Sequence, residues 1–128
     1  MERTPPCPHY AQCGGCNLQH LSLESYQKHK TDIAHKTLEK LRYEPEFLGE
    51  LFLSGESVRR RTKLSVRKNK KEITLGYAIK GSHEVVDVRE CIVLEPRLVA
   101  LFAPLRTLIA SLKKSGNISD IHLSLIHI

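Results

Sequence analysis

Apolar residues follow two different spacings along this chain, one typical of helices and the other of strands. In the first third, after Ser22, they recur at helical spacing: Leu23, Tyr26, Ile33, Ala34, Leu38 and Leu41. The other face carries Lys28, Lys30, Lys36 and Lys40, which is typical of a solvated surface. We therefore expect an amphipathic helix that begins at the N-cap residue Ser22 and follows an irregular loop over residues 1–20.

The apolar spacing changes to two after Pro45 and the Ser54-Gly55 pair. From Val58 to Arg67, one set of alternating residues is mostly apolar (Val58, Thr62, Leu64, Val66) and the other is basic (Arg59, Arg61, Lys63, Arg67). This pattern predicts a strand with one core face and one cationic face. Lys68-Asn69-Lys70-Lys71 is predicted to be a hairpin turn into a strand over 72–79, and Gly81-Ser82 a turn into a strand over 84–88.

A second amphipathic helix is predicted over residues 97–114. Its apolar stripe consists of Leu98, Leu101, Phe102, Leu105, Leu108, Ile109 and Leu112. Pro104 falls inside the stripe, so it should kink the helix or mark its true first turn. Gly116-Asn117 should end the helix, and Ile121, Leu123 and Leu125 begin a last strand. The expected fold class is α+β: a cysteine loop and helix over 1–45, then an antiparallel sheet with a packed helix over 46–128.

Length and charge narrow the class of protein. The 128 residues, 41% of them hydrophobic, can form one ordinary domain or two small lobes. No apolar run approaches the roughly 20 residues that cross a bilayer, so we expect a cytoplasmic protein with no membrane partner. Lys and Arg number 20 against 14 Asp and Glu, a net charge of +6 that predicts a polyanionic partner.

The basic charge is concentrated in one segment. Between Arg59 and Lys71, eight of thirteen residues are Arg or Lys and none is acidic. Such like charges repel one another unless an anion compensates them, and guanidinium groups suit bidentate phosphate contacts. The pattern favours RNA binding by Arg59, Arg60, Arg61, Lys63 and Arg67. The alternative is a solvated strand edge that lysines protect from aggregation.

The four cysteines predict a metal centre. Cys7, Cys13 and Cys16 share one loop in which Gly14 and Gly15 let the backbone curl, and Cys91 stands alone far along the chain. Four thiolates suit an iron–sulfur cluster or tetrahedral zinc, and three ligands in one loop favour iron–sulfur. Disulfides are the weaker alternative, since no apolar signal segment precedes a chain with so few cysteines. A loop histidine such as His9 could be a ligand, but a solvated position is the simpler interpretation.

Several segments together resemble the RNA uracil-5-methyltransferase family. They are Cys-Pro-His-Tyr-Ala-Gln-Cys-Gly-Gly-Cys-Asn-Leu-Gln-His-Leu (7–21), Arg-Arg-Arg-Thr-Lys-Leu-Ser-Val (59–66), Leu-Gly-Tyr (75–77), Gly-Ser-His-Glu-Val-Val-Asp-Val (81–88) and Glu-Cys (90–91). The resemblance implies S-adenosylmethionine-dependent methylation of uridine in ribosomal or transfer RNA. It also implies a 4Fe-4S cluster with Cys7, Cys13, Cys16 and Cys91 as its ligands.

The resemblance implies parts that this sequence does not contain. Family members continue into a Rossmann-like domain with a glycine-rich S-adenosylmethionine loop, a catalytic cysteine and an acidic base. Here no G-x-G-x-x-G occurs, and all four cysteines are already assigned to the cluster. We therefore expect a monomeric central, substrate-recognising region with a structural cluster, which is inactive without the domain that binds S-adenosylmethionine and flips out the target base.

Two further expectations concern alternatives and the end of the chain. A nonenzymatic zinc or iron–sulfur RNA-binding module is the main alternative function, while ferredoxin-type electron carriers have denser cysteines and are commonly acidic. The last six residues, Leu-Ser-Leu-Ile-His-Ile, resemble translated sequencing-adapter read-through. We expect a truncated reading frame, with a natural short hydrophobic end as the alternative.

Overall fold

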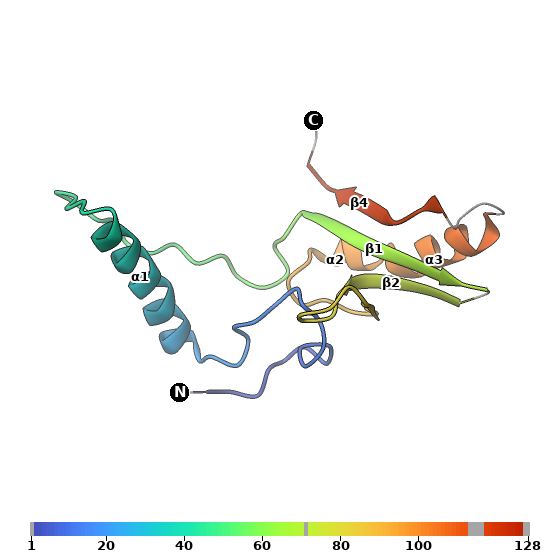
Figure 1. Ribbon diagram of the computed structural model, residues 1–128, viewed down its shortest axis with the longest axis horizontal. Coiled ribbons are helices and arrows are strands. Elements are labelled where there is room, and N and C mark those ends of the chain that lie inside the picture. The colour runs from blue at the N-terminus through green and yellow to red at the C-terminus, as the bar shows by residue number, and fades with distance from the viewer. Residues whose placement is uncertain (1, 71, 113–116, 127–128) are drawn as a thin grey trace. The chain divides into compact units, whose positions relative to one another are not determined.

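The predicted α+β class is confirmed. The computed structural model describes residues 2–70, 72–112 and 117–126, and these contain helices and one antiparallel sheet of four strands. In chain order the elements are α1 (Leu23–Lys40), β1 (Arg61–Asn69), β2 (Glu72–Ala78), β3 (Val85–Asp87), α2 (Pro96–Val99), α3 (Phe102–Ser111) and β4 (Asp120–Ser124) (Figure 1).

The chain forms two compact units, which are described separately here. One comprises Met1–Pro5 and Leu18–Ser54, and the other Pro6–Asn17 and Gly55–Ile128. The cysteine loop thus groups with the sheet, whereas the predicted division placed it with the first helix and set the boundary after residue 45. Long-range backbone pairing of the loop causes this grouping, and composition along the chain carries no sign of it.

Helix α1 begins where its N-cap was predicted. The Ser22 hydroxyl accepts a hydrogen bond from the Ser25 backbone N–H at 3.2 Å, which satisfies a donor that the first helical turn leaves unpaired. Lys40 lies in the last turn, where a cation favours the helix dipole. No residue of α1 is buried, so the predicted apolar stripe forms no core of its own. None of the described helices, including this longest one, has the length and hydropathy of a membrane span.

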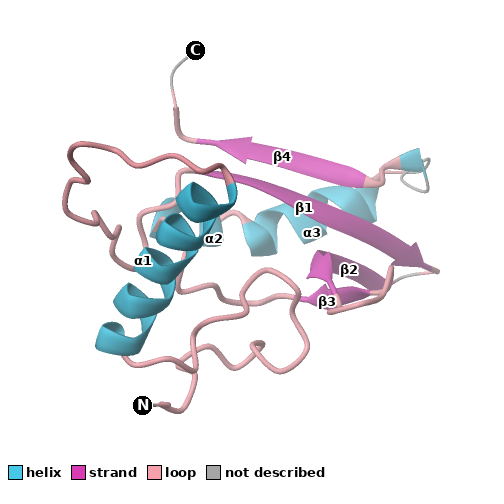
Figure 2. Cartoon of the chain, turned by 60° about the vertical axis from the view of Figure 1, so that its left-hand side comes forward, coloured by secondary structure: helices cyan, strands magenta, loops and turns pink. Residues whose placement is uncertain are grey.

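The sheet has the strand order β3-β2-β1-β4 among the described residues (Figure 2). All neighbours are antiparallel, as predicted, and the register places apolar residues opposite one another. The paired residues include Val66 with Leu75, Leu64 with Ile121, and Tyr77 with Val86. Because side chains alternate along a strand, these six residues share one face of the sheet.

The predicted turn after β1 is a tight hairpin. Asn69 pairs with Glu72, so only residues 70 and 71 connect the two strands. Lys70 has a φ of 53°, the left-handed conformation that two-residue hairpin turns require. The turn prediction is confirmed for Lys70, but Lys68 and Asn69 belong to β1 rather than to the turn, and Lys71 lies outside the described residues.

The single helix predicted over 97–114 is two helices. Pro96 opens α2, and α3 begins at Phe102, which places Pro104 in its first turn. The proposal that Pro104 marks a true first turn is therefore confirmed, because a proline in that position removes no helical hydrogen bond. Leu112 has extended backbone and ends α3 earlier than predicted. The predicted end at Lys114 and Gly116 lies outside the described residues.

The core lies between the apolar face of the sheet and helices α2 and α3 (Figure 1). The sheet contributes Leu64, Val66, Leu75, Val86 and Val88, and the segment from Leu94 onward contributes Leu94, Leu98, Phe102 and Ile109. Gly76 is required between β2 and β3, since a Cβ there would collide with the Val86 carbonyl oxygen. This close approach lets the edge strand pack tightly beside β2.

Candidate functional site

The cysteine loop is attached to the end of β2 by its backbone. Cys13 and Ile79 form an isolated antiparallel bridge. The Gly14 N–H donates to the Ala78 carbonyl at 2.8 Å, and the Lys80 N–H donates to the Gln12 carbonyl at 3.1 Å. These bonds fix the loop against the sheet.

Gly14 serves a different purpose from the predicted one. Neither Gly14 nor Gly15 has a positive φ, so the loop does not use the left-handed conformation that only glycine adopts easily. A Cβ at Gly14 would lie 2.7 Å from the Ala78 carbonyl oxygen. Glycine is thus needed at position 14 for close approach to β2, while at Gly15 a Cβ would make only ordinary contacts.

His9 joins the loop to the segment that precedes Cys91. Its ring Nε2 accepts a hydrogen bond from the Arg89 backbone N–H at 3.3 Å. Its carbonyl also accepts the Cys13 N–H at 2.8 Å, which closes a turn inside the loop. The simple interpretation of a solvated loop histidine is therefore incomplete: His9 connects two segments that both carry cysteines.

Cys91 lies after β3 in a segment that runs beside the residues just before β1. Ile92 accepts a hydrogen bond from the Ser57 N–H at 2.8 Å, and Arg59 and Leu94 form a parallel bridge. Cys91 and the cysteine loop belong to the same compact unit. Cys13 is buried, and the other three cysteines are half-buried. None of the four cysteines forms a disulfide.

The four thiols form one electrostatic group. Burial raises the pKa of the Cys7 thiol, a hydrogen bond with the His9 backbone lowers it, and charges at Cys91, Cys16 and Glu90 raise it further. Burial likewise raises the pKa of Cys13, opposed by the Gly15 N–H and reinforced by the other three cysteines. Burial and, to a smaller extent, this mutual repulsion favour the protonated form of the Cys7 and Cys13 thiols.

The thiols lie near one another but are not arranged as ligands. Within the described residues, no three His, Cys, Asp or Glu side chains have the geometry to bind a metal ion. The donor set itself is chemically suitable, because four cysteines are the ligand set of both 4Fe-4S clusters and structural zinc. Metal binding would require the side chains to converge and lose their protons.

Tyr77 interacts both with β1 and with two of the cysteines. Its hydroxyl is 2.6 Å from the Thr62 hydroxyl. Burial is the largest influence on the pKa of Tyr77 and raises it, and the charges of Cys91 and Cys13 act in the same direction. The hydrogen bond with Thr62 and the charge of Arg59 lower it. The ring therefore lies within electrostatic range of two predicted cluster ligands and one predicted RNA-binding residue. Sequence patterns predicted only that Tyr77 lies in a strand over 72–79.

The predicted alternation is confirmed from Arg61 to Arg67, but it does not extend back to Val58, which precedes β1 and is 49% exposed rather than in the core. Leu64 and Val66 are buried and Thr62 is half-buried, while Arg61, Lys63 and Arg67 are exposed. In the neighbouring strand β4, Ser124 lies opposite Arg61, and His122 lies opposite Lys63. Arg59 and Arg60 precede β1 and are also exposed. The basic strand, meaning Arg59–Arg67, thus presents Arg61, Lys63 and Arg67 along the face away from the core, with Arg59 and Arg60 exposed just before β1.

Few carboxylates neutralise the basic strand. Lys63 pairs with Asp120 at 3.4 Å across the β1–β4 ladder. Among the described residues, Arg59, Arg60 and Arg61 have no carboxylate within 4.0 Å. Arg67 donates instead to the Val66 carbonyl at 2.8 Å. The three consecutive arginines keep their charges available for an external anion.

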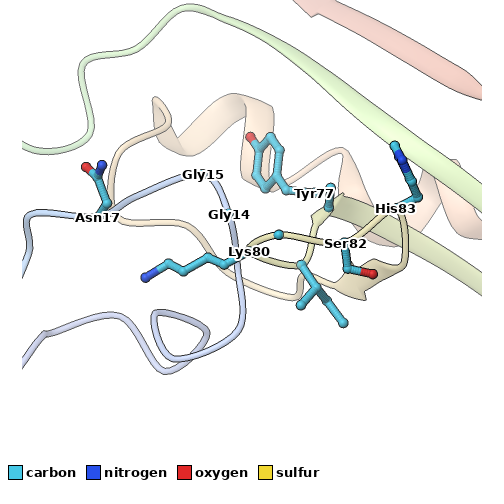
Figure 3. Close-up of a pocket in the computed structure, with 10 residues that line it drawn as sticks. Gly14, Gly15, Asn17, Tyr77, Lys80, Ser82 and His83 are labelled. Atoms are coloured by element: carbon cyan, nitrogen blue, oxygen red, sulfur yellow. The ribbon is translucent and has the colours of Figure 1, made fainter.

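Two grooves border the cysteine loop. The first, of about 770 Å³, runs between Gly14–Asn17 and the segment Tyr77–His83. Figure 3 shows Lys80 and Asn17 toward one end of it and Ser82 and His83 toward the other. The second, of about 520 Å³, is lined by Gly15, Tyr77 and residues of the paired strands β1 and β4. Sequence patterns assigned no role to Lys80, and its position next to the predicted Gly81-Ser82 turn was the available signal.

Curated proteins named 23S rRNA (uracil(1939)-C(5))-methyltransferase RlmD match nearly the whole chain. The protein from Halomonas elongata is 39% identical over 121 residues, which cover 93% of this chain and 25% of that protein. The one from Shewanella sediminis is 40% identical over 126 residues, 95% of this chain and 28% of its own length. The one from Haemophilus ducreyi is 32% identical over 125 residues, with 96% and 28% covered.

These matches confirm the predicted family resemblance. The chain spans about a quarter of the length of the curated relatives it matches. No protein-family model matches it. The compared region includes the cysteine loop and the basic strand, since the matches cover almost the entire sequence.

Proposed function

From the premise that this chain is similar to RNA uracil-5-methyltransferases along nearly its whole length, we propose that it is the iron–sulfur and RNA-binding portion of such an enzyme. The proposed parent activity is S-adenosylmethionine-dependent methylation of uracil C5 in ribosomal RNA. The observation that carries the proposal is the 32–40% identity to proteins of that name over 93–96% of this chain. A cytoplasmic monomer would suffice for this role.

In this proposal Cys7, Cys13, Cys16 and Cys91 hold a 4Fe-4S cluster. Two facts support the assignment: the pKa values of Cys7 and Cys13 are raised in part by the other cysteines, and hydrogen bonds already hold the cysteine-bearing segments together. The iron ions would supply the positive charge that favours thiolates over thiols. The cluster would then cross-link the cysteine loop to the segment after β3.

The basic strand would bind the phosphates of the RNA. Arg59, Arg60, Arg61, Lys63 and Arg67 are exposed, and all of them except Lys63 have no carboxylate partner among the described residues. Backbone pairing on both sides of β1 fixes the spacing of these cations. A fixed row of guanidinium groups binds phosphates with less loss of side-chain entropy than a flexible tail does.

Replacing Arg61 with Ala should weaken RNA binding about tenfold, equivalent to about 1.4 kcal/mol, the scale of one charge-assisted hydrogen bond. The slope of log K against log salt should decrease by about 0.7–0.9 for one lost phosphate contact. Fluorescence anisotropy with a labelled rRNA fragment at several salt concentrations measures both quantities. Arg61 is exposed, so the far-ultraviolet circular dichroism should not change.

Lys70→Ala is the matched control, because it also removes one positive charge but lies at the hairpin tip. It should change affinity less than Arg61→Ala does. Equal affinity of Arg61→Ala and the unmodified chain would refute the assignment of the basic strand to RNA. The alternative of a solvated strand edge, protected from aggregation by lysines, would then account for the positive charge of this segment.

The 128-residue chain alone should not methylate RNA. Uracil C5 is a poor nucleophile until a thiolate adds at C6, and the four cysteines are assigned to the cluster. With labelled S-adenosylmethionine and 23S rRNA, we expect no label in the RNA. The Halomonas elongata relative, whose name states this activity, is the positive control for the assay. Transfer of label by this chain would show that one of its cysteines is catalytic.

A nonenzymatic RNA-binding module with zinc or iron–sulfur remains the second candidate. It is supported by the absence of a glycine-rich cofactor motif from the sequence. The methyl-transfer assay cannot separate the two candidates, because both predict an inactive chain. The two candidates predict different results when this chain is combined with the remaining part of a relative. The combination should be active if the chain is a portion of a methyltransferase, and inactive if the chain is a nonenzymatic module.

A further inference from the structure

We propose that the two grooves beside the cysteine loop form one continuous path for single-stranded RNA. The path runs from the basic strand, across Tyr77 and Gly15, to Lys80. This inference rests on the proposed function and extends it by naming the form of the RNA and the route it follows. It also makes the cysteine loop one wall of the RNA site.

Continuity of the path follows from shared residues. Gly15 and Tyr77 line both grooves, so the grooves meet at these two residues. The two volumes, about 770 and 520 Å³, each lie within the range of about 300–1,000 Å³ that small-ligand sites occupy. An extended strand of several nucleotides can therefore occupy them in sequence.

The charges along the path suit a phosphate backbone. Arg59, Arg61 and Lys63 line one groove, and Lys80 lines the other. No acidic residue is among the described residues that line either groove. The Lys80 ammonium lies 4.1 Å from the centroid of the Tyr10 ring, a contact that restrains its position. Cations at both ends with a neutral centre match phosphates on either side of a base.

The centre of the path suits a nucleobase. Tyr77 is half-buried, and its hydrogen bond to Thr62 fixes the orientation of the ring. Gly15 presents bare backbone beside the ring, since a Cβ there would lie 3.7 Å from Tyr77 Cδ2. Aromatic rings and flat polar surfaces are what unpaired bases stack on, and each stacked base contributes about 1–3 kcal/mol.

A single strand fits these features better than a duplex does. Bases in an A-form duplex are stacked on one another, so proteins read such a duplex mostly through its shape, phosphates and 2′-hydroxyls. A ring at the junction of two grooves contributes to affinity only if a base can leave its stack. The aromatic centre therefore selects unpaired RNA, while the cations alone would accept both forms.

The path also couples RNA binding to the cysteine loop. The Gly15 N–H donates to the Cys13 sulfur at 3.4 Å, so the wall of the groove and a proposed cluster ligand are directly joined. Gly14 and Asn17 extend the same wall (Figure 3). Binding of metal by the loop should then fix the groove as well as the fold.

The test uses a labelled oligouridylate of about eight nucleotides, within the range that single-strand sites cover. Lys80→Gln should weaken its binding several-fold and lower the salt slope by about 0.7, the single-strand value for one phosphate. Gly15→Val should weaken binding at least fivefold, because the added methyl groups project into the junction while position 15 tolerates a Cβ. Lys70→Gln, at the hairpin tip, is the control.

Two checks keep the result interpretable. Circular dichroism and iron content show whether Gly15→Val still folds and binds metal; if it does not, Lys80→Gln alone decides. In addition, an oligonucleotide with 4-thiouridine should cross-link to the unmodified protein at the tryptic peptide of residues 72–80, which contains Tyr77. An RNA duplex of about 16 base pairs, the span of a typical duplex-binding domain, should bind less tightly and respond little to Gly15→Val.

The outcomes separate this inference from the proposed function. If Arg61→Ala weakens binding but Lys80→Gln and Gly15→Val do not, the groove is not the path, although the basic strand still binds RNA. If Arg61→Ala also has no effect, the proposed RNA-binding function itself fails. An equal loss of affinity for duplex and single strand would overturn the preference for single-stranded RNA.

Discussion

Replacing Cys91 with Ser should abolish metal binding. Purified without oxygen, the unmodified chain should be brown, with about four irons and four sulfides per chain. Cys91→Ser and Cys16→Ser should each lose both, together with the visible absorbance. Colour and analysis for iron, sulfide and zinc provide the measurement.

The reason for the large effect is that metal binding and folding share one free energy. Structural metal sites contribute an apparent free energy of about 10–16 kcal/mol in small zinc domains, and an iron–sulfur site with the same ligand number has a comparable role. Cys91 is the most distant ligand in the sequence, so its bond closes the longest loop. Its loss should be as damaging as any change within the cysteine loop.

His9→Gln is the control for this experiment. The ring Nε2 of His9 already accepts a hydrogen bond from the Arg89 N–H. The variant should therefore keep its full iron content and most of its stability, because the glutamine side-chain oxygen can still accept a hydrogen bond from the Arg89 N–H. A colourless protein with one zinc per chain that folds normally would contradict the cluster assignment and favour the zinc alternative.

Local chemistry made most elements predictable from the sequence. Ser22 is a strong N-cap because its hydroxyl satisfies a free N–H, and it begins α1 as expected. Pro104 can occupy only a first turn or a kink, and the structure shows the first turn. The alternation from Thr62 to Val66 fixed both the strand and its core face. Each of these depends on residues close together in the chain.

Features that depend on distant residues could not be predicted. The bridge between Cys13 and Ile79 joins two residues that are far apart in the sequence. Sequence patterns therefore did not predict that the cysteine loop groups with β2. The tight approach at Gly76 depends on the position of Val86 in another strand. Arg106 lies within an apolar helix, where sequence patterns assign a charge to the surface.

Arg106 instead makes the best-satisfied ion pair among the described residues. Its Nη2 donates to Asp87 Oδ1 at 2.7 Å and to the Val88 carbonyl at 2.7 Å, and its Nε donates to the same carboxylate oxygen at 3.2 Å. The Leu75 N–H also donates to Asp87 Oδ1 at 3.1 Å. The Arg106 side chain is only 11% exposed, so it joins α3 to the edge of the sheet beneath the surface.

Arg106→Met should lower the free energy of unfolding at pH 7 by about 3 kcal/mol, the lower end of the range for breaking a buried ion pair. The lower end applies because the Asp87 side chain keeps 32% of its exposure and a second ion pair with Arg89. Urea unfolding followed by circular dichroism measures the difference. Arg97→Met is the control, since the Arg97 side chain is 74% exposed in its ion pair and should contribute less than about 1 kcal/mol.

The difference between Arg106→Met and the unmodified chain should shrink in acid. Burial alone would raise the pKa of Asp87, but hydrogen bonds from Arg106 and the Leu75 N–H, with the charges of Arg106 and Arg89, hold it below its usual value. Because the pKa of Asp87 is lower in the folded state than in the unfolded state, where it is about 3.9, its ionised form stabilises the fold at pH values above 3.9. This stabilisation is lost as the pH falls through the pKa of the folded state.

In the variant, Asp87 is buried without Arg106, which makes its negative charge unfavourable at neutral pH. Protonation of Asp87 removes that penalty. The gap in unfolding free energy should therefore narrow between about pH 5 and pH 3. A gap that stays constant over this range would mean that Arg106 acts through packing and its hydrogen bonds to carbonyls rather than through the charge of Asp87.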